Sequence, residues 1–245
     1  MLSKLELEIH YNHTEQLTYH ISSTMHGLLM DYVDYEYGEL LHRDGRKPFH
    51  QYLSQMKRDS FVWTICTLNE EARIQIIDRL KEQDHFLLKH KNLNLYVTDR
   101  KLTEMSYDEL IERYYFEPQS RNIRLRFLTP TSFKSQGRYV FFPDLKLIFQ
   151  SLMLKYDAFS DTTAMASPEV LEHIENYSYI RNYNLRSIYF SLEGVKINAF
   201  LGEITIHVNG PEQMVNLMHL MTAYGEYAGV GIKSSLGMGA IHKIE

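Results

Sequence analysis

The same order of strand-like and helix-like patterns occurs twice along this chain, and that repetition limits the fold more than any other feature. In the first half, apolar and polar residues alternate from Leu5 to Ile9, as in a half-buried strand. The patterns that follow are a helix, two strands, a helix and a strand, at 14–42, 49–53, 61–67, 69–80 and 86–97. This β-α-β-β-α-β order is typical of a ferredoxin-like unit.

The second half repeats this order, and two of its strand patterns follow each other closely enough to predict a hairpin. Its strand and helix patterns lie at 123–128, 143–156, 185–192, 196–208, 211–221 and 240–244. We therefore predict an α+β fold of two tandem ferredoxin-like domains. The predicted boundaries are 1–118 for the first domain and 119–245 for the second, with a linker around Pro118.

Several details of the first half can be predicted separately. The helix at 14–42 is expected to be continuous unless Gly38 breaks or bends it. Asn69 is predicted to cap the second helix through its side chain. The inward face of that helix is expected to consist of Ile74, Ile77 and Leu80. A further helix is predicted over 103–120.

A glycine-rich stretch, residues 229–239, lies between the last helix and the last strand. Such a loop exposes backbone N–H groups and often receives a phosphate. It lacks the second glycine that a P-loop needs before Lys233, and it also lacks the spacing of a dinucleotide-binding turn. Two alternatives therefore stay open for this loop: a contact with a phosphate or nucleic acid, and a plain turn from helix to strand. The candidate contact residues are Gly229, Gly231, Lys233, Ser234, Ser235, Gly237 and Gly239.

Composition excludes several classes of protein. Cys66 is the single cysteine of 245 residues, which excludes an internal disulfide and predicts a reducing cytoplasm. The sequence has neither an apolar run of membrane-spanning length nor a signal-peptide pattern. A net charge of −5 means that a nucleic-acid site would be a local basic stripe. Its candidates, which could equally form a solvated strand face, are Arg121, Arg124, Arg126, Lys134, Arg138 and Lys233.

The doubled unit with this loop resembles the RAMP superfamily of CRISPR-associated RNA-binding proteins. More narrowly, it resembles the repeat-cleaving endoribonucleases found with type III-A systems, and the likeness covers essentially the whole chain. Its strongest carrier is the stretch 225–239, which is similar to the glycine-rich C-terminal signature of that family. Further matches are 129–133, 200–204, and Leu41-His42 followed by Lys47-Pro48-Phe49. The family usually has threonine next, where this chain has His50.

This resemblance implies a metal-independent endoribonuclease that cuts CRISPR precursor transcripts within each repeat and releases guide RNAs. The ribose 2′-OH would attack the adjacent phosphate, which gives a 2′,3′-cyclic phosphate and a 5′-OH. No cofactor is implied. The expected partner is CRISPR repeat RNA, single-stranded or weakly structured. A homodimer and a transient contact with a type III effector complex stay open, and no membrane contact is expected.

The reaction needs a base and an acid, and histidine suits both roles. His42 is the first candidate by family position, with Lys47 to stabilise the phosphate. The alternative for His42 is a histidine that interacts with the dipole at the end of its helix. His26 is a second candidate, and its alternative is a partly buried helix histidine. A tyrosine often completes such sites, and Tyr32 is our candidate among Tyr32, Tyr35 and Tyr37.

RNA binding is expected to use the N–H groups of the glycine-rich loop together with Lys134. Arg124 and Arg126 are expected to line the groove between the two halves, since they share one strand face. No metal site is predicted, because the sequence has neither His-Glu-x-x-His nor Cys-x-x-Cys. Two alternatives remain: a non-catalytic RAMP subunit that holds guide RNA in an effector complex, and a general RRM-like module. The second would need an RNP-type aromatic run, which 124–127 does not supply.

Overall fold

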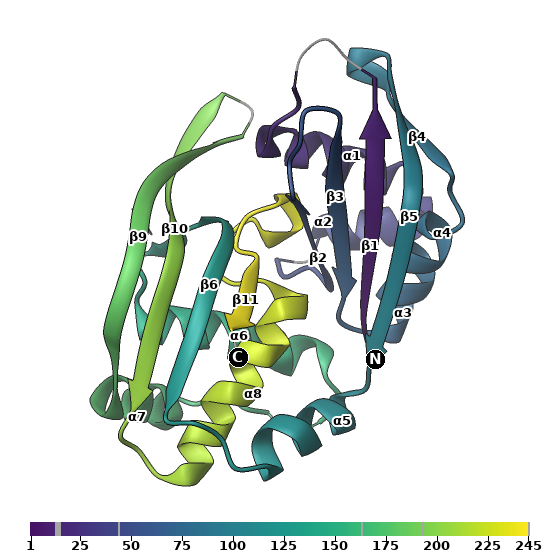
Figure 1. Cartoon of the computed structure of the whole chain (residues 1–245). Coiled ribbons are helices and arrows are strands. Elements are labelled where there is room, and N and C mark those ends of the chain that lie inside the picture. The colour runs from purple at the N-terminus through teal and green to yellow at the C-terminus, as the bar shows by residue number, and fades with distance from the viewer. Residues whose placement is uncertain (13–15, 44, 163, 193, 245) are drawn as a thin grey trace.

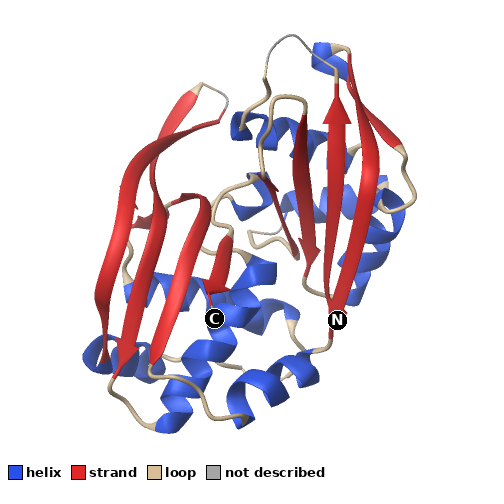
Figure 2. Cartoon of the chain, in the orientation of Figure 1, coloured by secondary structure: helices blue, strands red, loops and turns tan. Residues whose placement is uncertain are grey.

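Two antiparallel sheets lie beside each other, and helices pack behind both of them (Figures 1 and 2). The computed structural model describes residues 1–12, 16–43, 45–162, 164–192 and 194–244. The start of the predicted first helix at Thr14 lies outside the described residues. None of the helices described is both long enough and apolar enough to cross a membrane.

The first sheet has five strands in the order β2-β3-β1-β5-β4, and all neighbouring strands are antiparallel. These strands are β1 (Leu2–Tyr11), β2 (Phe49–Ser54), β3 (Ser60–Thr67), β4 (His85–Leu88) and β5 (Leu93–Met105). The helical segments of this half are η1 (Tyr19–Ile21), α1 (Ser22–Met30), α2 (Tyr35–Arg43), α3 (Glu70–Ala72), η2 (Arg73–Ile77), α4 (Asp78–Leu80) and η3 (Lys89–Lys91). The alternation along β1 buries Leu5, Leu7 and Ile9 in one apolar cluster with α1 and α2.

The second sheet has four strands in the order β11-β6-β10-β9, again antiparallel throughout. These strands are β6 (Asn122–Thr131), β9 (Ser178–Leu192), β10 (Val195–Val208) and β11 (Ile241–Ile244). A separate ribbon pairs β7 (Phe133–Ser135) with β8 (Arg138–Val140). The helical segments of this half are α6 (Leu145–Phe159), α7 (Pro168–Tyr177), α8 (Glu212–Ala228) and η5 (Ser234–Leu236).

Both sheets have the strand order of a ferredoxin-like unit. The first strand of each half is central: β1 lies between β3 and β5, and β6 lies between β10 and β11. In the first sheet β4 is added as an extra edge strand. The prediction of an α+β fold with two ferredoxin-like units is therefore confirmed.

The first predicted helix is not continuous. It ends at Met30, a turn follows, and α2 begins at Tyr35, so the break lies before Gly38, which is inside α2. The Gly38 N–H donates to the carbonyl oxygen of Asp34, which starts the second helix. The turn lets two short helices each bury an apolar face against the sheet, with Leu29 on α1 and Leu41 on α2.

Two further predictions in the first half were wrong in detail. The stretch 86–97 forms two strands rather than one, and the turn between them places Asn92 in the left-handed region at φ +47°.

Asn69 caps the second helix as predicted, since its side chain accepts a hydrogen bond from the Ala72 N–H at 2.9 Å. However, Ile74 is 49% exposed and Ile76 is buried instead. The π-helical turn η2 shifts the spacing of the inward positions.

The two halves share part of their core. A single apolar cluster contains Leu2, Cys66 and Leu68 of the first half together with side chains of β6, α6 and α8. The connection between the sheets contains α5 (Tyr107–Ile111) and η4 (Glu112–Phe116), which pack on α8. The predicted helix at 103–120 is thus shorter and begins after Ser106. This residue forms a capping box with Glu109, which starts the helix directly after β5.

Candidate functional site

The glycine-rich loop joins α8 to β11 along a backbone path that favours glycine at several positions. Gly231 and Gly239 both have a φ of +75°. A Cβ atom on Gly239 would lie 1.9 Å from the carbonyl oxygen of Val230. A Cβ atom on Gly231 would lie 2.3 Å from the carbonyl oxygen of Ser132. Because the conflicting atoms belong to the backbone, these glycines fix the shape of the loop.

Hydrogen bonds attach the loop to neighbouring elements but leave some of its donors free. The Gly239 N–H donates to the carbonyl oxygen of Pro130 at 3.0 Å, and the Gly231 N–H donates to the hydroxyl of Ser151 at 2.9 Å. Three successive N–H groups make no hydrogen bond within the described part of the chain: those of Lys233, Ser234 and Ser235. Successive free donors of this kind suit an anion such as a phosphate.

A buried lysine on α6 holds the loop from inside. The Nζ atom of Lys155 donates to the carbonyl oxygens of Ala228 and Gly229 at 2.8 and 3.0 Å, and to the hydroxyl of Ser234 at 2.9 Å. Burial, with a smaller contribution from the charge of Arg46, lowers the pKa of Lys155 to about 7. Lys155 therefore connects the end of α8 to η5 and stabilises the path between them.

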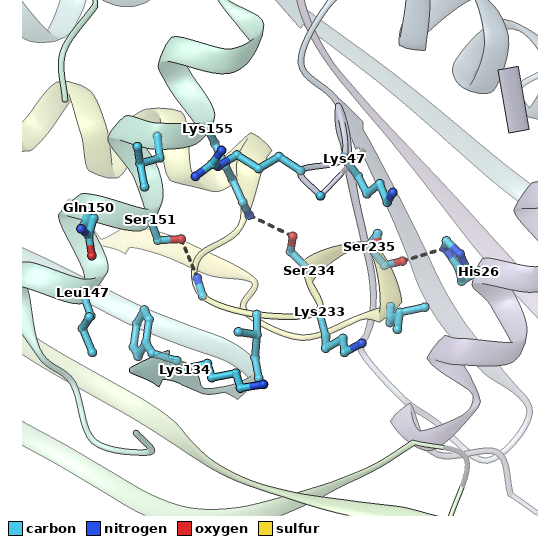
Figure 3. A pocket seen from close by; sticks show the side chains of 17 residues that line it. His26, Lys47, Lys134, Leu147, Gln150, Ser151, Lys155, Lys233, Ser234 and Ser235 are labelled. Atoms are coloured by element: carbon cyan, nitrogen blue, oxygen red, sulfur yellow. Dashed lines mark hydrogen bonds between the residues drawn. The ribbon is translucent and has the colours of Figure 1, made fainter. Parts of the chain in front are cut away.

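A cavity of about 590 Å³ lies between the two halves at this loop (Figure 3). His26 and Lys47 lie on the side of the first sheet, and Ser151 and Lys155 lie on the other side (Figure 3). Its cationic lining consists of Arg46, Lys47, Lys134 and Lys233, and no Asp or Glu is among the described residues that line it. Such a cavity attracts polyanions. In the described ranges, no three His, Cys, Asp or Glu side chains gather as metal ligands would.

His26 lines this cavity from α1, and its ring is fixed in one orientation. Its Nδ1 lies 3.1 Å from the carbonyl oxygen of Ser235, and its ring stacks on Phe49 with centroids 5.7 Å apart. A carbonyl oxygen only accepts, so Nδ1 carries the proton and Nε2 of the neutral ring has the free lone pair. Burial lowers the pKa of His26 to about 4, and the nearby charges of His42 and Lys47 contribute to the shift. His26 is therefore a neutral proton acceptor near pH 7.

The carbonyl that orients His26 is itself held by a buried amide. Gln51 Nε2 donates to the carbonyl oxygens of Ser22 and Ser235 at 2.9 and 3.1 Å. The indole N–H of Trp63 donates to Gln51 Oε1 at 2.9 Å, which fixes the orientation of the amide. This network joins the core of the first half to the loop of the second. Sequence analysis gave no sign of Gln51 or Trp63 as parts of the site.

His42 and Lys47 are close enough to His26 for their charges to act on it, but only Lys47 lines the cavity. His42 is exposed in the last turn of α2. Tyr32 lies apart from this group, because its ring packs edge-on against Phe86 of β4 with centroids 5.6 Å apart. Of the four predicted catalytic residues, His26 and Lys47 thus share the cavity, whereas His42 and Tyr32 lie outside its lining.

The predicted RNA-binding residues separate into two groups. Lys134 and the loop share the cavity described above, whereas Arg124 and Arg126 lie on the exposed face of β6. There Arg126 Nε donates to a carboxylate oxygen of Glu203 at 2.6 Å. Arg124 lines a different cavity of about 560 Å³ together with Arg181. The two arginines therefore do not line the cavity at the glycine-rich loop, and their contact with RNA in the groove between the two halves stays a prediction.

His50 lies behind the loop rather than in the cavity. It is fully buried, and neither ring nitrogen makes a hydrogen bond of full geometry within the described structure, although the backbones of Tyr227 and Met238 lie close to the ring. A Cβ atom on Gly229 would approach its ring to 2.9 Å, so the two halves are in close contact here. Burial, together with the charges of Lys155 and Lys4, lowers the pKa of His50 to about 3. This position is structural.

We expect acid to destabilise the protein partly through His50. Its folded-state pKa lies below the ordinary value near 6.5, so the unfolded chain binds a proton that the folded chain excludes as pH falls from about 6.5 to about 3. One such proton lowers the free energy of unfolding by about 1.4 kcal/mol per pH unit. The free energy of unfolding, measured with denaturant, is expected to fall less between pH 7 and pH 5 for His50→Gln than for the wild type. An equal loss contradicts this. His85→Gln is the control, because that side chain is exposed.

Known proteins resemble this chain in sequence. The sequence model of the CRISPR-associated endoribonuclease Cas6 matches residues 125–241. A Cas6 from Streptococcus thermophilus is 33% identical over 220 residues, which cover 88% of this chain and 88% of that protein. A Cas6 from Mycobacterium tuberculosis is 33% identical over 219 residues, 89% of this chain and 69% of that protein.

Solved structures show the same fold over the whole chain. A Thermus thermophilus Cas6 product complex has a TM-score of 0.83 at 23% identity, with 100% of both chains covered. A Cas6 substrate mimic complex has a TM-score of 0.75 at 20% identity, with 99% of both chains covered. Because it is 33% identical to two Cas6 proteins over most of its length, the chain belongs to the family of CRISPR-associated endoribonucleases Cas6.

Proposed function

We propose that this protein cuts CRISPR precursor transcripts within each repeat to release guide RNAs, and that it does so without a metal ion. The observation that carries the proposal is His26, a neutral imidazole of fixed tautomer in a cavity with four cationic side chains. Relatives of matching fold include a Cas6 product complex and a Cas6 substrate mimic complex, which supports RNA as the substrate.

In the proposed reaction, Nε2 of His26 accepts the proton of the ribose 2′-OH at the cleavage position. The 2′-oxygen attacks the adjacent phosphorus, and the bond from phosphorus to the 5′-oxygen of the next nucleotide breaks. His42 gives a proton to that leaving oxygen. The products are a 2′,3′-cyclic phosphate and a 5′-OH. Lys47 stabilises the charge that develops on the phosphorane.

The glycine-rich loop holds the phosphate backbone in this proposal. The free N–H groups of Lys233, Ser234 and Ser235 act as donors, and the charges of Lys233 and Lys134 neutralise phosphates beside them. Arg124 and Arg126 form a second basic surface on the exposed face of β6, where they contact RNA outside the cavity. Tyr32 has no role in the proposed chemistry, given its place against Phe86.

We also propose the organisation in which this activity operates. Residues 1–118 and 119–245 form two domains that meet at the cavity. The protein works in the cytoplasm with a type III-A system, where its guide RNAs pass to an effector complex. A homodimer stays a prediction, and light scattering of the purified protein tests it.

Cleavage in the presence of EDTA tests this function. Purified protein is expected to cut a repeat RNA once in EDTA, and to leave intact a matched RNA whose scissile 2′-OH is replaced by hydrogen. A protein that binds the repeat but leaves it intact would instead be a non-catalytic RNA-holding subunit. Equal cleavage of the 2′-deoxy substrate, or cleavage that EDTA abolishes, contradicts the mechanism.

A further inference from the structure

Beyond the cavity, a group of aromatic side chains lies exposed on the second half. We call Tyr139, Phe141, Phe142 and Tyr183 the aromatic strip. They are 42%, 41%, 54% and 61% exposed, respectively, although large apolar side chains are usually covered. The rings of Phe142 and Tyr183 meet edge to face, with centroids 6.1 Å apart at 82°. The strip therefore joins the end of β8 to the outer edge strand β9.

The charge around the aromatic strip is one-sided. The two segments that supply it, 132–143 and 178–192, contain four cationic residues and no Asp or Glu. Lys134 and Arg138 belong to the β7–β8 ribbon that carries Tyr139. Arg181 and Arg186 are on β9, where Arg181 lines the second cavity with Arg124. The chain as a whole has a net charge of −5, so the positive charge of these two segments contrasts with the negative charge of the whole chain. Exposed rings beside the two cations of the ribbon match the chemistry of single-stranded nucleic acid.

The aromatic strip is continuous with the cavity. Lys134 lines the cavity from β7, and in the β7–β8 ribbon it pairs directly with Tyr139. Directly opposed residues of an antiparallel pair lie on the same face, so this tyrosine is beside a side chain that lines the cavity. An RNA strand that leaves the cavity past Lys134 therefore meets Tyr139 first.

We propose that the aromatic strip binds single-stranded RNA that flanks the cleavage position, with bases stacked on its rings and phosphates held by Lys134 and Arg138. This rests on the proposed function and adds a second region of substrate contact to it. A protein partner or a second copy of this chain would also cover exposed rings. The absence of carboxylates in both segments favours a polyanion instead.

The test uses two uncleavable repeat RNAs with a 2′-deoxy cleavage position. One ends close to that position, and the other is extended by single-stranded nucleotides on both sides. We expect wild-type protein to bind the extended RNA more tightly, and Tyr183→Ala and Phe142→Ala to weaken that binding about tenfold with little change for the short RNA. Tyr183→Phe keeps the ring and should bind as the wild type does. Tyr96→Ala is the matched control, a tyrosine 52% exposed on the other half.

The outcomes separate this inference from the proposed function. If the wild type neither binds the short RNA nor cuts its unmodified form, which keeps the scissile 2′-OH, the proposed function fails. If it cuts that unmodified form but binds both 2′-deoxy RNAs equally, or if the alanine variants weaken binding of both RNAs equally, the strip does not hold the flanks. If Tyr183→Ala changes only the mass measured by light scattering, the strip is a contact between copies and the inference is wrong.

Discussion

Replacing His42 with alanine is expected to lower the rate of repeat-RNA cleavage by about 10²–10⁴-fold and to leave RNA affinity close to that of the wild type. The reason is that His42 is exposed at the end of α2, outside the lining of the cavity, yet near enough for its charge to act on His26. It can therefore deliver a proton without holding the substrate. Single-turnover cleavage and binding of a 2′-deoxy repeat RNA measure the two effects separately.

His26→Ala, assayed in the same way, assigns the second proton transfer. A comparable loss is expected, and in wild-type protein the rate should fall as pH drops toward about 4, where His26 becomes protonated and can no longer accept a proton. Tyr32→Phe is the control, since that hydroxyl lies away from the cavity, and it should retain wild-type turnover. Wild-type turnover by His42→Ala would remove that residue from the site.

Gly239→Ala is expected to have the largest effect on stability, about 4 kcal/mol or more in the free energy of unfolding. The added methyl group would lie 1.9 Å from the Val230 carbonyl oxygen, at a φ of +75° that side chains rarely adopt. Chemical denaturation measures the change. Where the variant remains folded, RNA affinity should fall as well, because the loop must move.

Gly27→Ala is the matched control for that substitution. Gly27 is on α1, and a Cβ atom there has nothing within 4 Å. Alanine is the better helix former by about 0.5–1 kcal/mol, so this variant should be slightly more stable than the wild type. If Gly239→Ala unfolds at the same denaturant concentration as the wild type, the loop is less constrained than its geometry indicates.

The sequence was informative where the determining pattern is local. Alternation along β1 and β6 placed the central strands of both sheets, and the spacing of the glycines singled out the loop. His26, Lys134 and Lys233 were recognised as candidates and share the cavity. Tyr32 was misplaced, because the helix was taken as continuous and the turn after Met30 carries this ring to Phe86.

The parts that sequence analysis missed depend on contacts between distant segments. Lys155 lies in an apolar run on α6 and meets its partners 73 to 79 residues later in the chain. A lysine within a buried helix face was the one available signal of its role. Gln51 reaches Ser235 across 184 residues, and no local pattern predicts that contact. Arg124 and Arg126 were correctly placed on one strand face, but the direction of that face depends on how the sheets pack.

The backbone of Ser235 serves two parts of the site at once. Its carbonyl oxygen sets the tautomer of His26, while its N–H is one of the free donors proposed to hold the phosphate backbone. An RNA that fits poorly and displaces this loop would also release the imidazole from its acceptor. Binding of the RNA backbone by the loop and orientation of the His26 ring therefore depend on the same residue. A mismatched transcript can then be bound without being cut.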